Sequence, residues 1–243
     1  MTALDLDRIV AEIVEYLLVE TSLASYIDHT QLRPDATSAD IVKLCEEAKL
    51  YGFATVCVNP YWVTLAAAQL AGSAVKVCSV VGFPLGASAS AMKCAEAELA
   101  IRNGAREIDM VINVGALREG DLETVRLDIK AVADVCHRHG ALLKVILENA
   151  LLNREQKVAG CEAAQRAGAD FVKTSTGFAA SGATPEDVAL MRSVVGPGMG
   201  VKAAGGVRTR ADALLMIEAG ANRLGASSSV AIMKGSGPTR SGY

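Results

Sequence analysis

Short apolar runs rich in β-branched residues alternate with amphipathic stretches of helical length along most of this chain. This alternation constrains the fold more than any other feature, because it is typical of a parallel sheet whose strands are joined by crossover helices. Helix-like sequence follows each of the eight candidate strands. These strands are expected at residues 26–29, 53–58, 75–81, 107–112, 142–147, 170–174, 200–203 and 223–225. The sequence therefore predicts eight βα units.

Helix start and stop signals agree with this count. Asn153 followed by Gln156 resembles a capping box, Thr184 followed by Pro185 gives a cap with proline in the first turn, and Ser38 begins another helix. Glycines stand a few residues before several strands, where a left-handed residue is needed to end a helix and turn the chain back. They are Gly52, Gly104, Gly140, Gly168 and Gly220.

Eight parallel strands could form an open doubly wound sheet or a closed barrel. The open class usually carries a Gly-rich dinucleotide fingerprint in its first βα turn, and no G-x-G-x-x-G occurs in this sequence. We therefore expect an α/β fold with a single (βα)8 TIM barrel formed by residues 1–243. Residues 1–24 are expected to form an extra N-terminal helix, and residues 235–243 a flexible C-terminal tail.

Charge and cysteine usage exclude several classes of protein. The formal net charge of −3 gives no basic footprint, so we expect a small-molecule partner and no nucleic acid. The uncharged stretch between Lys49 and Lys76 is interrupted by Pro60, which predicts a strand and a helix begun by Pro60 rather than a membrane span. Six cysteines without a C-x-x-C pair or an apolar leader predict reduced thiols in the cytoplasm.

Polar side chains gather near the predicted strand ends, where barrel enzymes carry their active sites. Residues two apart on a strand share a side, so Asp109, Val111 and Asn113 form one row, and Lys144, Ile146 and Glu148 another. The alternative is that each charge is one half of a buried ion pair that fixes barrel register. The candidate polar residues are Asp28, Cys57, Asp109, Lys144, Lys173 and Lys202.

Lys173 and Lys202 occupy matching positions on adjacent predicted strands, whose backbones should lie roughly 4.8 Å apart. At a separation of about 6 Å and an effective dielectric constant of about 20, two ammonium groups repel by ~3 kcal/mol. We therefore expect one lysine to be partly neutral, which is the form that attacks an aldehyde to give a Schiff base. A carboxylate such as Asp109 could orient the second lysine and shuttle protons.

Glycine and serine follow predicted strands seven and eight, the usual phosphate site of this fold. We expect Gly205, Gly206, Ser227 and Ser228 to bind a phosphate, the alternative being an ordinary glycine turn. The three histidines share no helix or strand face, so no metal is expected. Cys57 is the cysteine of interest, because it lies at a strand end; the others are more typical of core packing.

Two segments resemble the signature segments of the deoxyribose-phosphate aldolase family: residues 171–177, FVKTSTG, and residues 201–208, VKAAGGVR. Asp28-His29-Thr30 and segments 107–111, 143–148 and 224–228 resemble further parts of the family in the expected order. The resemblance implies reversible cleavage of 2-deoxy-D-ribose 5-phosphate to D-glyceraldehyde 3-phosphate and acetaldehyde. It implies no metal and no organic cofactor, because a lysine iminium is the electron sink.

Carried over to this chain, the resemblance implies that Lys173 forms the Schiff base, that Lys202 favours its neutral form, and that Asp109 takes part in proton relay. The phosphate would be held by Gly205, Gly206, Ser227 and Ser228. Further candidates are Asp28, Cys57 and Lys144 for catalysis, Thr176 and Gly177 for substrate binding, and Tyr243 for proton transfer at the acetaldehyde methyl group. A homo-oligomer, specifically a dimer, is the family expectation.

This chain departs from the family pattern at two positions. Ala203 stands where the family commonly has proline, and Phe178 where it often has a lysine that could contact phosphate. Tyr243 could bend back to the barrel mouth or belong to a frayed terminus. Two rival functions also remain: another Schiff-base aldolase on the same barrel, and a barrel that binds a sugar phosphate without turnover.

Overall fold

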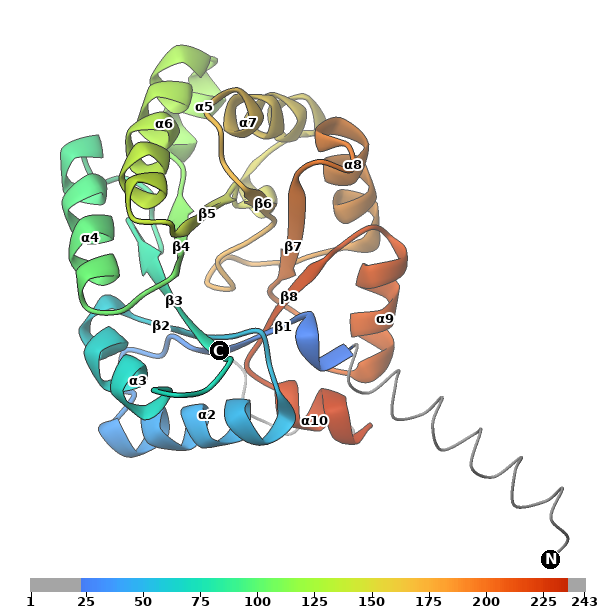
Figure 1. The fold of residues 1–243 in the computed structure, drawn as a ribbon. Coiled ribbons are helices and arrows are strands. Elements are labelled where there is room, and N and C mark those ends of the chain that lie inside the picture. The colour runs from blue at the N-terminus through green and yellow to red at the C-terminus, as the bar shows by residue number, and fades with distance from the viewer. Residues whose placement is uncertain (1–22, 236–243) are drawn as a thin grey trace, which may run out of the picture.

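The structure, a computed structural model, describes residues 23–235, in which eight parallel strands close into one barrel in the order β1 to β8. Figure 1 shows these strands at the centre with the helices outside them. The predicted α/β barrel is confirmed, whereas the predicted N-terminal extension lies outside the described residues except for the buried Leu23 and Ala24. The strands are β1 (Ile27–Gln31), β2 (Thr55–Val58), β3 (Lys76–Val81), β4 (Glu107–Val111), β5 (Leu142–Ile146), β6 (Phe171–Lys173), β7 (Gly200–Ala204) and β8 (Arg223–Ala226).

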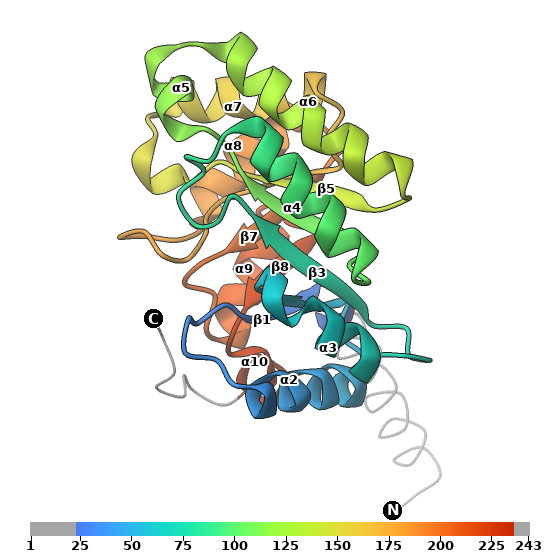
Figure 2. The ribbon, with the colours of Figure 1, turned by 90° about the vertical axis from the view of Figure 1, so that its left-hand side faces the viewer.

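Helices cover the outer face of the barrel and bury the outward side chains of the strands against their own apolar faces. Figure 2, a view at right angles, shows α4 and α6 side by side across the strands β3 to β5. The helices are α2 (Ser38–Tyr51), α3 (Val63–Gln69), α4 (Ser90–Arg102), α5 (Val114–Glu119), α6 (Leu122–Arg138), α7 (Arg154–Arg166), α8 (Pro185–Val195), α9 (Arg210–Glu218) and α10 (Ser229–Lys234), with 3-10 turns η1 (Pro60–Trp62) and η2 (Asn149–Leu151).

Local sequence signals set the helix ends. Asn153 and Gln156 form the predicted capping box at α7, and Thr184 caps α8 with Pro185 in the first turn. The helix predicted from Ser38 begins there, with Thr37 as its cap. The five glycines predicted to end helices all have positive φ, as a left-handed turn residue requires.

The uncharged stretch before Lys76 is a strand followed by helix, as predicted, but the helix starts later than expected. Pro60 begins the 3-10 turn η1, and α3 continues from Val63. Within residues 23–235, no helix combines the length and the apolar character that crossing a bilayer requires.

The predicted inward rows are shorter than expected, because two strands end early. Strand β4 ends at Val111, and the side chain of Asn113 caps α5 by accepting a hydrogen bond from the Ala116 N–H. Strand β5 ends at Ile146, and Glu148 adopts a left-handed conformation with φ of 59°. The side chains of Asp109 and Lys144 point into the barrel, as predicted. The prediction was wrong for Asn113 and Glu148, because both lie beyond the ends of their strands.

Candidate active site

The carboxylate of Asp109 lies at the centre of the barrel interior and is completely buried. Its Oδ1 accepts hydrogen bonds from Lys144 Nζ at 2.8 Å and Cys78 Sγ at 3.2 Å. Its Oδ2 accepts hydrogen bonds from Lys173 Nζ at 2.8 Å and Lys202 Nζ at 2.7 Å. One carboxylate therefore joins side chains from β3, β4, β5, β6 and β7.

Strand register places the two lysines side by side. Lys173 of β6 and Lys202 of β7 are direct partners in the parallel pair, as the sequence predicted. Gly225 of β8 leaves room for Lys202, because a Cβ at this position would lie 3.1 Å from Lys202 Cε and 2.9 Å from Ala204 Cβ. The absence of a side chain at residue 225 thus allows the Lys202 stem to cross the barrel interior towards Asp109.

Two further carboxylates extend this arrangement across the barrel. Asp28 of β1 lies 2.5 Å from Lys202 Nζ and accepts a hydrogen bond from Arg223 Nη1 at 2.8 Å. Glu107 of β4 accepts a hydrogen bond from the same Arg223 nitrogen at 2.8 Å and lies 2.6 Å from Lys144 Nζ. We call the connected side chains the interior cluster. It consists of Asp28, Glu107, Asp109, Lys144, Lys173, Lys202 and Arg223.

The sequence placed the polar residues near the strand ends, but most of the interior cluster lies deeper in the barrel. Lys173 is the last residue of β6, but Asp109, Lys144 and Lys202 are each the third of five residues in their strands. Strands in a closed barrel are tilted and staggered, so the middle of one strand can lie level with the end of another. The cluster therefore runs from the strand starts at Glu107 and Arg223 up to Lys173.

Within the interior cluster, attraction between opposite charges affects the pKa values more than burial does. Burial opposes ionisation of Asp109, but Lys144, Lys173 and Lys202 hold its pKa well below the ordinary value. Burial likewise opposes ionisation of Asp28, but Lys202, Lys144 and Arg223 lower its pKa. For Lys202, burial favours the neutral amine, yet Asp109 and Asp28 raise its pKa above the usual lysine range. Asp109 in the same way raises the pKa of the buried Lys144.

Charge balance singles out one lysine. The interior cluster has four basic side chains and three carboxylates, so one base lacks a carboxylate of its own. Lys144, Lys202 and Arg223 each contact at least two carboxylates, whereas Lys173 contacts Asp109. Lys173 is thus the base of the cluster with the fewest carboxylate contacts.

This changes the expected electrostatics of the lysine pair. The sequence predicted two ammonium groups that repel at about 6 Å in a medium of moderate dielectric constant. In the structure both amines donate to Oδ2 of Asp109, so the carboxylate offsets their repulsion. The excess of bases over carboxylates in the whole cluster, rather than repulsion between two isolated lysines, is therefore the distinctive electrostatic feature of the site.

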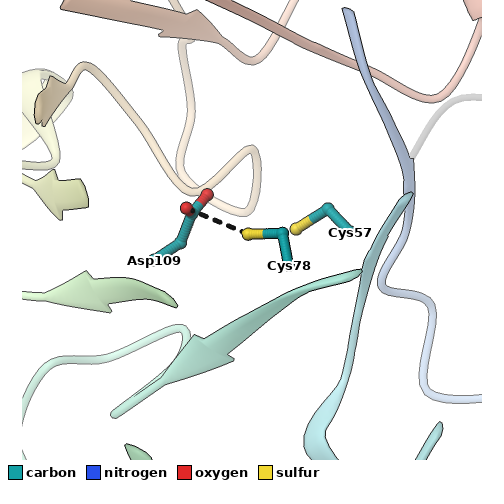
Figure 3. Close-up of side chains that lie close together, drawn as sticks. All are labelled: Cys57, Cys78 and Asp109. Atoms are coloured by element: carbon teal, nitrogen blue, oxygen red, sulfur yellow. Dashed lines mark hydrogen bonds between the residues drawn. The ribbon is translucent and has the colours of Figure 1, made fainter. Parts of the chain in front are cut away.

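Two thiols lie beside Asp109, as Figure 3 shows. Cys57 of β2 and Cys78 of β3 are register partners, and their sulfurs lie within 4.8 Å of one another and of an Asp109 oxygen. A hydrogen bond from the Cys78 thiol lowers the pKa of Cys57, while burial raises the pKa of Cys78. These three residues have ligand types that zinc accepts. Both Asp109 oxygens, however, already accept from lysine ammonium groups.

Loops after β7 and β8 bring together the predicted phosphate residues. Ala204 and Gly225 are partners in the β7–β8 pair, so Gly205 and Gly206 follow one strand where Ser227 and Ser228 follow its neighbour. Gly205 and Gly206 have φ of 81° and 82°, and a Cβ at Gly206 would meet no atom within 4 Å. Backbone donors in such a turn are the usual anion ligands.

Thr176 and Gly177 follow β6 and lie at the same end of the barrel as the loops after β7 and β8, in a different part of it. The Thr176 hydroxyl donates to the Glu148 carboxylate and accepts from the Phe178 N–H at 3.0 Å. Gly177 has φ of 88°. Phe178, 42% exposed, meets the Phe83 ring edge-on with centroids 5.3 Å apart. An aromatic pair therefore stands where the family pattern suggested a lysine.

Three residues of this site escaped the sequence reasoning: Cys78, Glu107 and Arg223. Strand parity could have indicated Glu107, which is two residues before Asp109 on the same strand. The predicted role of Tyr243 lies outside the described residues. The three histidines have structural partners: His29 bonds Ser229 and Glu47, and the other two lie against carboxylates on the surface.

The fold and the interior cluster define a barrel enzyme with buried amines next to a buried carboxylate. Comparison with known proteins gives the family. The chain belongs to the DeoC/LacD family of aldolases, whose model matches residues 22–235. It is therefore a lyase of the aldolase type, as the sequence predicted.

Several similar proteins are named deoxyribose-phosphate aldolase. A deoxyribose-phosphate aldolase of Geobacillus sp. (strain WCH70) is 60% identical over 217 residues, which cover 89% of this chain and 97% of that protein. One from Thermococcus gammatolerans is 58% identical over 90% of this chain and 98% of its own. The solved tetrameric deoxyribose phosphate aldolase of Aeropyrum pernix superposes with a TM-score of 0.84 at 36% identity, covering 91% of this chain and 95% of that one.

Proposed function

We propose that this protein reversibly cleaves 2-deoxy-D-ribose 5-phosphate to D-glyceraldehyde 3-phosphate and acetaldehyde through a Schiff base on Lys173. The observation that carries the mechanism is that Lys173 is the surplus base of the interior cluster and shares Asp109 Oδ2 with Lys202, whose pKa the neighbouring carboxylates raise. The name shared by the similar proteins supports the substrate.

The first step is attack of the neutral Lys173 amine on the C1 aldehyde of the open-chain sugar. A proton is needed on the departing carbinol oxygen, and Lys202 or Lys144 can deliver it through Asp109 because both lie within hydrogen-bond distance of that carboxylate. Loss of water gives the iminium. The positive charge that forms on Nζ lies next to Asp109, which favours it.

The iminium then withdraws the electrons of the C2–C3 bond as a base removes the proton of the C3 hydroxyl. D-Glyceraldehyde 3-phosphate leaves, and an enamine remains on Lys173. Protonation at C2 and hydrolysis release acetaldehyde and restore the amine. Because the iminium accepts the electrons, we expect the reaction to need neither a metal nor an organic cofactor.

Borohydride reduction in the presence of acetaldehyde tests this proposal. Peptide mass mapping should find a reduced two-carbon adduct on Lys173, and the adduct should vanish in Lys173→Ala. Lys43→Ala, which removes an exposed lysine whose side chain is 74% accessible, is the control and should trap as well as the wild type. An adduct on another lysine, or activity abolished by a chelator, would overturn the mechanism.

Substrate comparison tests the two rival functions. Another Schiff-base aldolase would cleave keto-sugar phosphates faster than deoxyribose 5-phosphate. A silent sensor would bind the sugar phosphate, measured by calorimetry, with no release of acetaldehyde. We expect release of acetaldehyde and a strong preference for the deoxyribose ester.

Phosphate binding is proposed at Gly205, Gly206, Ser227 and Ser228, with Thr176 and Gly177 contacting the sugar. Gly206→Ala should be informative because φ of 82° strains any side chain there although open space surrounds it. We expect this variant to raise KM for deoxyribose 5-phosphate more than KM for unphosphorylated deoxyribose. Equal changes for the two substrates would place the phosphate elsewhere.

Tyr243 is proposed to transfer a proton at the acetaldehyde methyl group. Deleting this residue should slow exchange of the methyl protons with deuterated water and leave trapping on Lys173 nearly unchanged. Unchanged exchange would refute the role.

We also propose a homodimer acting in the cytoplasm on small molecules, without nucleic acid or membrane partners. The Aeropyrum pernix relative is described as tetrameric, so the assembly can differ between family members. Light scattering coupled to gel filtration decides between a dimer and a tetramer for this chain.

A further inference from the structure

Cys57 and Cys78 form a pair of neighbouring thiols, and no step of the proposed reaction involves both of them. They are direct register partners on neighbouring strands β2 and β3, and both are completely buried in the barrel interior. Partner residues on adjacent strands have Cα atoms roughly 4.8 Å apart, within the range that a disulfide bridges. Side chains that point into a closed barrel converge towards its axis, which brings the two sulfurs closer.

The thiol proton of Cys78 has two possible acceptors, one in the active site and one on the neighbouring sulfur. The Cys78 thiol can donate to Asp109 Oδ1, at 3.2 Å, or to Cys57. Donation to Cys57 favours its thiolate, and a thiolate is the form that attacks an oxidant. Lys202 and Lys173 add positive charge that favours the same form.

The surroundings of the pair favour a bond between the sulfurs over capture of a metal ion. One side of the pair is apolar, with Leu32, Val80 and Phe83 packed against the two cysteines. The other side is Asp109, whose oxygens already accept hydrogen bonds from lysine ammonium groups. A dication would have to displace those cations before the carboxylate could bind it, whereas a disulfide adds no charge to the barrel.

We propose that Cys57 and Cys78 are a modification site: a hydroperoxide oxidises them to a reversible cross-strand disulfide that suppresses the aldolase reaction. In the first step the Cys57 thiolate attacks one peroxide oxygen and forms a sulfenic acid, while the other oxygen takes up the proton that the Cys57 thiol gave up and leaves as water or an alcohol. In the second, the Cys78 sulfur displaces the sulfenic hydroxyl, which leaves as water with the Cys78 proton. Two thiols are oxidised and one hydroperoxide is reduced.

The disulfide suppresses catalysis through Asp109. Once Cys78 has lost its proton, Asp109 Oδ1 loses a donor, and the Lys144 Nζ that lies 3.3 Å from Cys78 Sγ loses a thiol contact. The carboxylate that orients Lys173 is then held by fewer partners. We therefore expect kcat to fall by about tenfold, a change that corresponds to ~1.4 kcal/mol and lies at the lower end of what a hydrogen bond to a charged group contributes. This step rests on the proposed aldolase function, whereas formation of the bond does not.

The tryptic map makes the bond directly measurable. Trypsin cleaves after Lys49, Lys76 and Lys93, so Cys57 and Cys78 fall in separate peptides, 50–76 and 77–93. Reduced protein is treated with a small excess of hydrogen peroxide, denatured in acid, alkylated and digested without reductant. We expect a linked 50–76/77–93 peptide, a fall in kcat of about tenfold, and recovery of both after dithiothreitol.

Variants separate this pair from general oxidation. Cys78→Ser keeps a hydroxyl donor for Asp109, whereas Cys78→Ala removes the donor. Neither variant can form the disulfide. After peroxide treatment, the activity of each variant should therefore fall by less than twofold relative to the same variant without treatment. Cys94→Ala removes a half-buried thiol of α4 and should respond to peroxide like the wild type. Absence of the linked peptide in the wild type overturns the proposal, as does equal inactivation of the Cys78 variants. The linked peptide forming in a protein without aldolase activity would instead overturn the proposed function and leave the modification site standing.

Discussion

Lys173 and Lys202 donate to the same oxygen of one buried carboxylate, Oδ2 of Asp109, at 2.8 Å and 2.7 Å. This shared acceptor lets two amines stand side by side on adjacent strands without a net repulsive contact. It also makes Asp109 the group through which a change at one lysine reaches the other.

Asp109→Asn keeps the shape of the side chain and removes its charge. The amide can no longer balance Lys144, Lys173 and Lys202, nor accept a proton during carbinolamine dehydration. We expect kcat to fall by about a hundredfold to ten-thousandfold, the usual range for loss of an acid-base group. Steady-state kinetics measure the fall, and circular dichroism shows whether the barrel remains folded. A loss below tenfold in a folded variant would remove Asp109 from proton transfer.

Lys202→Leu removes the cation beside Lys173. Asp109 is then left with one fewer ammonium, so it holds the Lys173 proton more tightly and neutral amine appears only in more alkaline solution. We expect the kcat/KM profile to move to higher pH by about one unit or more. Lys202→Arg retains the positive charge and is the matched control. An unmoved profile in Lys202→Leu would keep the Schiff base and discard the electrostatic reason for it.

Arg223 holds two buried carboxylates of the interior cluster in place. Its Nη1 bridges Asp28 and Glu107 at 2.8 Å each, and its guanidinium lies 5.4 Å from the centroid of the Phe171 ring. Arg223→Met leaves two buried carboxylates short of a cation, so we expect a loss of stability of about 3–5 kcal/mol. Urea unfolding measures the loss. Arg223→Lys should recover part of it, because a single nitrogen makes both contacts.

Arg223→Met should also lower kcat more than it raises KM, because the carboxylates it supports orient Lys202 and Lys144 rather than the substrate. A purely structural role would leave the kcat of the folded fraction unchanged.

Because of buried thiols outside the active site, we expect the folded protein to lose stability in alkaline solution. Burial raises the pKa of Cys136 and of Cys161 to about 12, and that of Cys45 to about 11. A raised pKa in the folded protein means that the contribution to stability is complete below the unfolded value, near 8.5, and is lost as pH rises towards the folded value. Stability should therefore fall between about pH 8.5 and 12, by up to about 1.4 kcal/mol per pH unit for each thiol.

Cys136→Val tests the sign and the assignment. Valine is of similar size and does not titrate, so the free energy of unfolding should fall less steeply with pH in this variant than in the wild type. Chemical denaturation at several pH values between about 8 and 10.5 gives both slopes. Identical slopes would show that Cys136 does not set the alkaline limit.

Sequence alone predicted the barrel because its signals are local. Most strands are short apolar runs, and several helices carry their own caps, as at Asn153 and Thr184. Register between β6 and β7 followed as well, because Lys173 and Lys202 stand at equivalent places in their runs. These features depend on residues close together in the chain.

The contents of the barrel were less predictable, because they depend on how strands are staggered. Glu107 and Arg223 are 116 residues apart in sequence yet meet at 2.8 Å, and nothing near Arg223 marks it as an interior residue. Cys78 looks like any other buried cysteine until β2 and β3 are placed in register. The shared acceptor on Asp109 likewise needs three strands in their final positions, so the sequence suggested lysine repulsion where the structure has a common carboxylate.

Phe178 offers the last prediction, on phosphate affinity. Its ring lies edge-on to Phe83, next to Gly177, and is 42% exposed. Phe178→Lys places a cation near the proposed phosphate loop, and an exposed ion pair contributes up to about 1 kcal/mol. We expect KM for deoxyribose 5-phosphate to fall by roughly threefold to fivefold, and less at high salt, because screening weakens the pair. KM for unphosphorylated deoxyribose should not fall, since that substrate has no anionic group. Phe178→Leu removes the aromatic contact without adding charge, so it separates the two effects of the substitution. If the leucine variant lowers KM for the phosphate ester as much as the lysine variant does, the gain comes from opening the aromatic pair, and the phosphate does not lie within reach of residue 178.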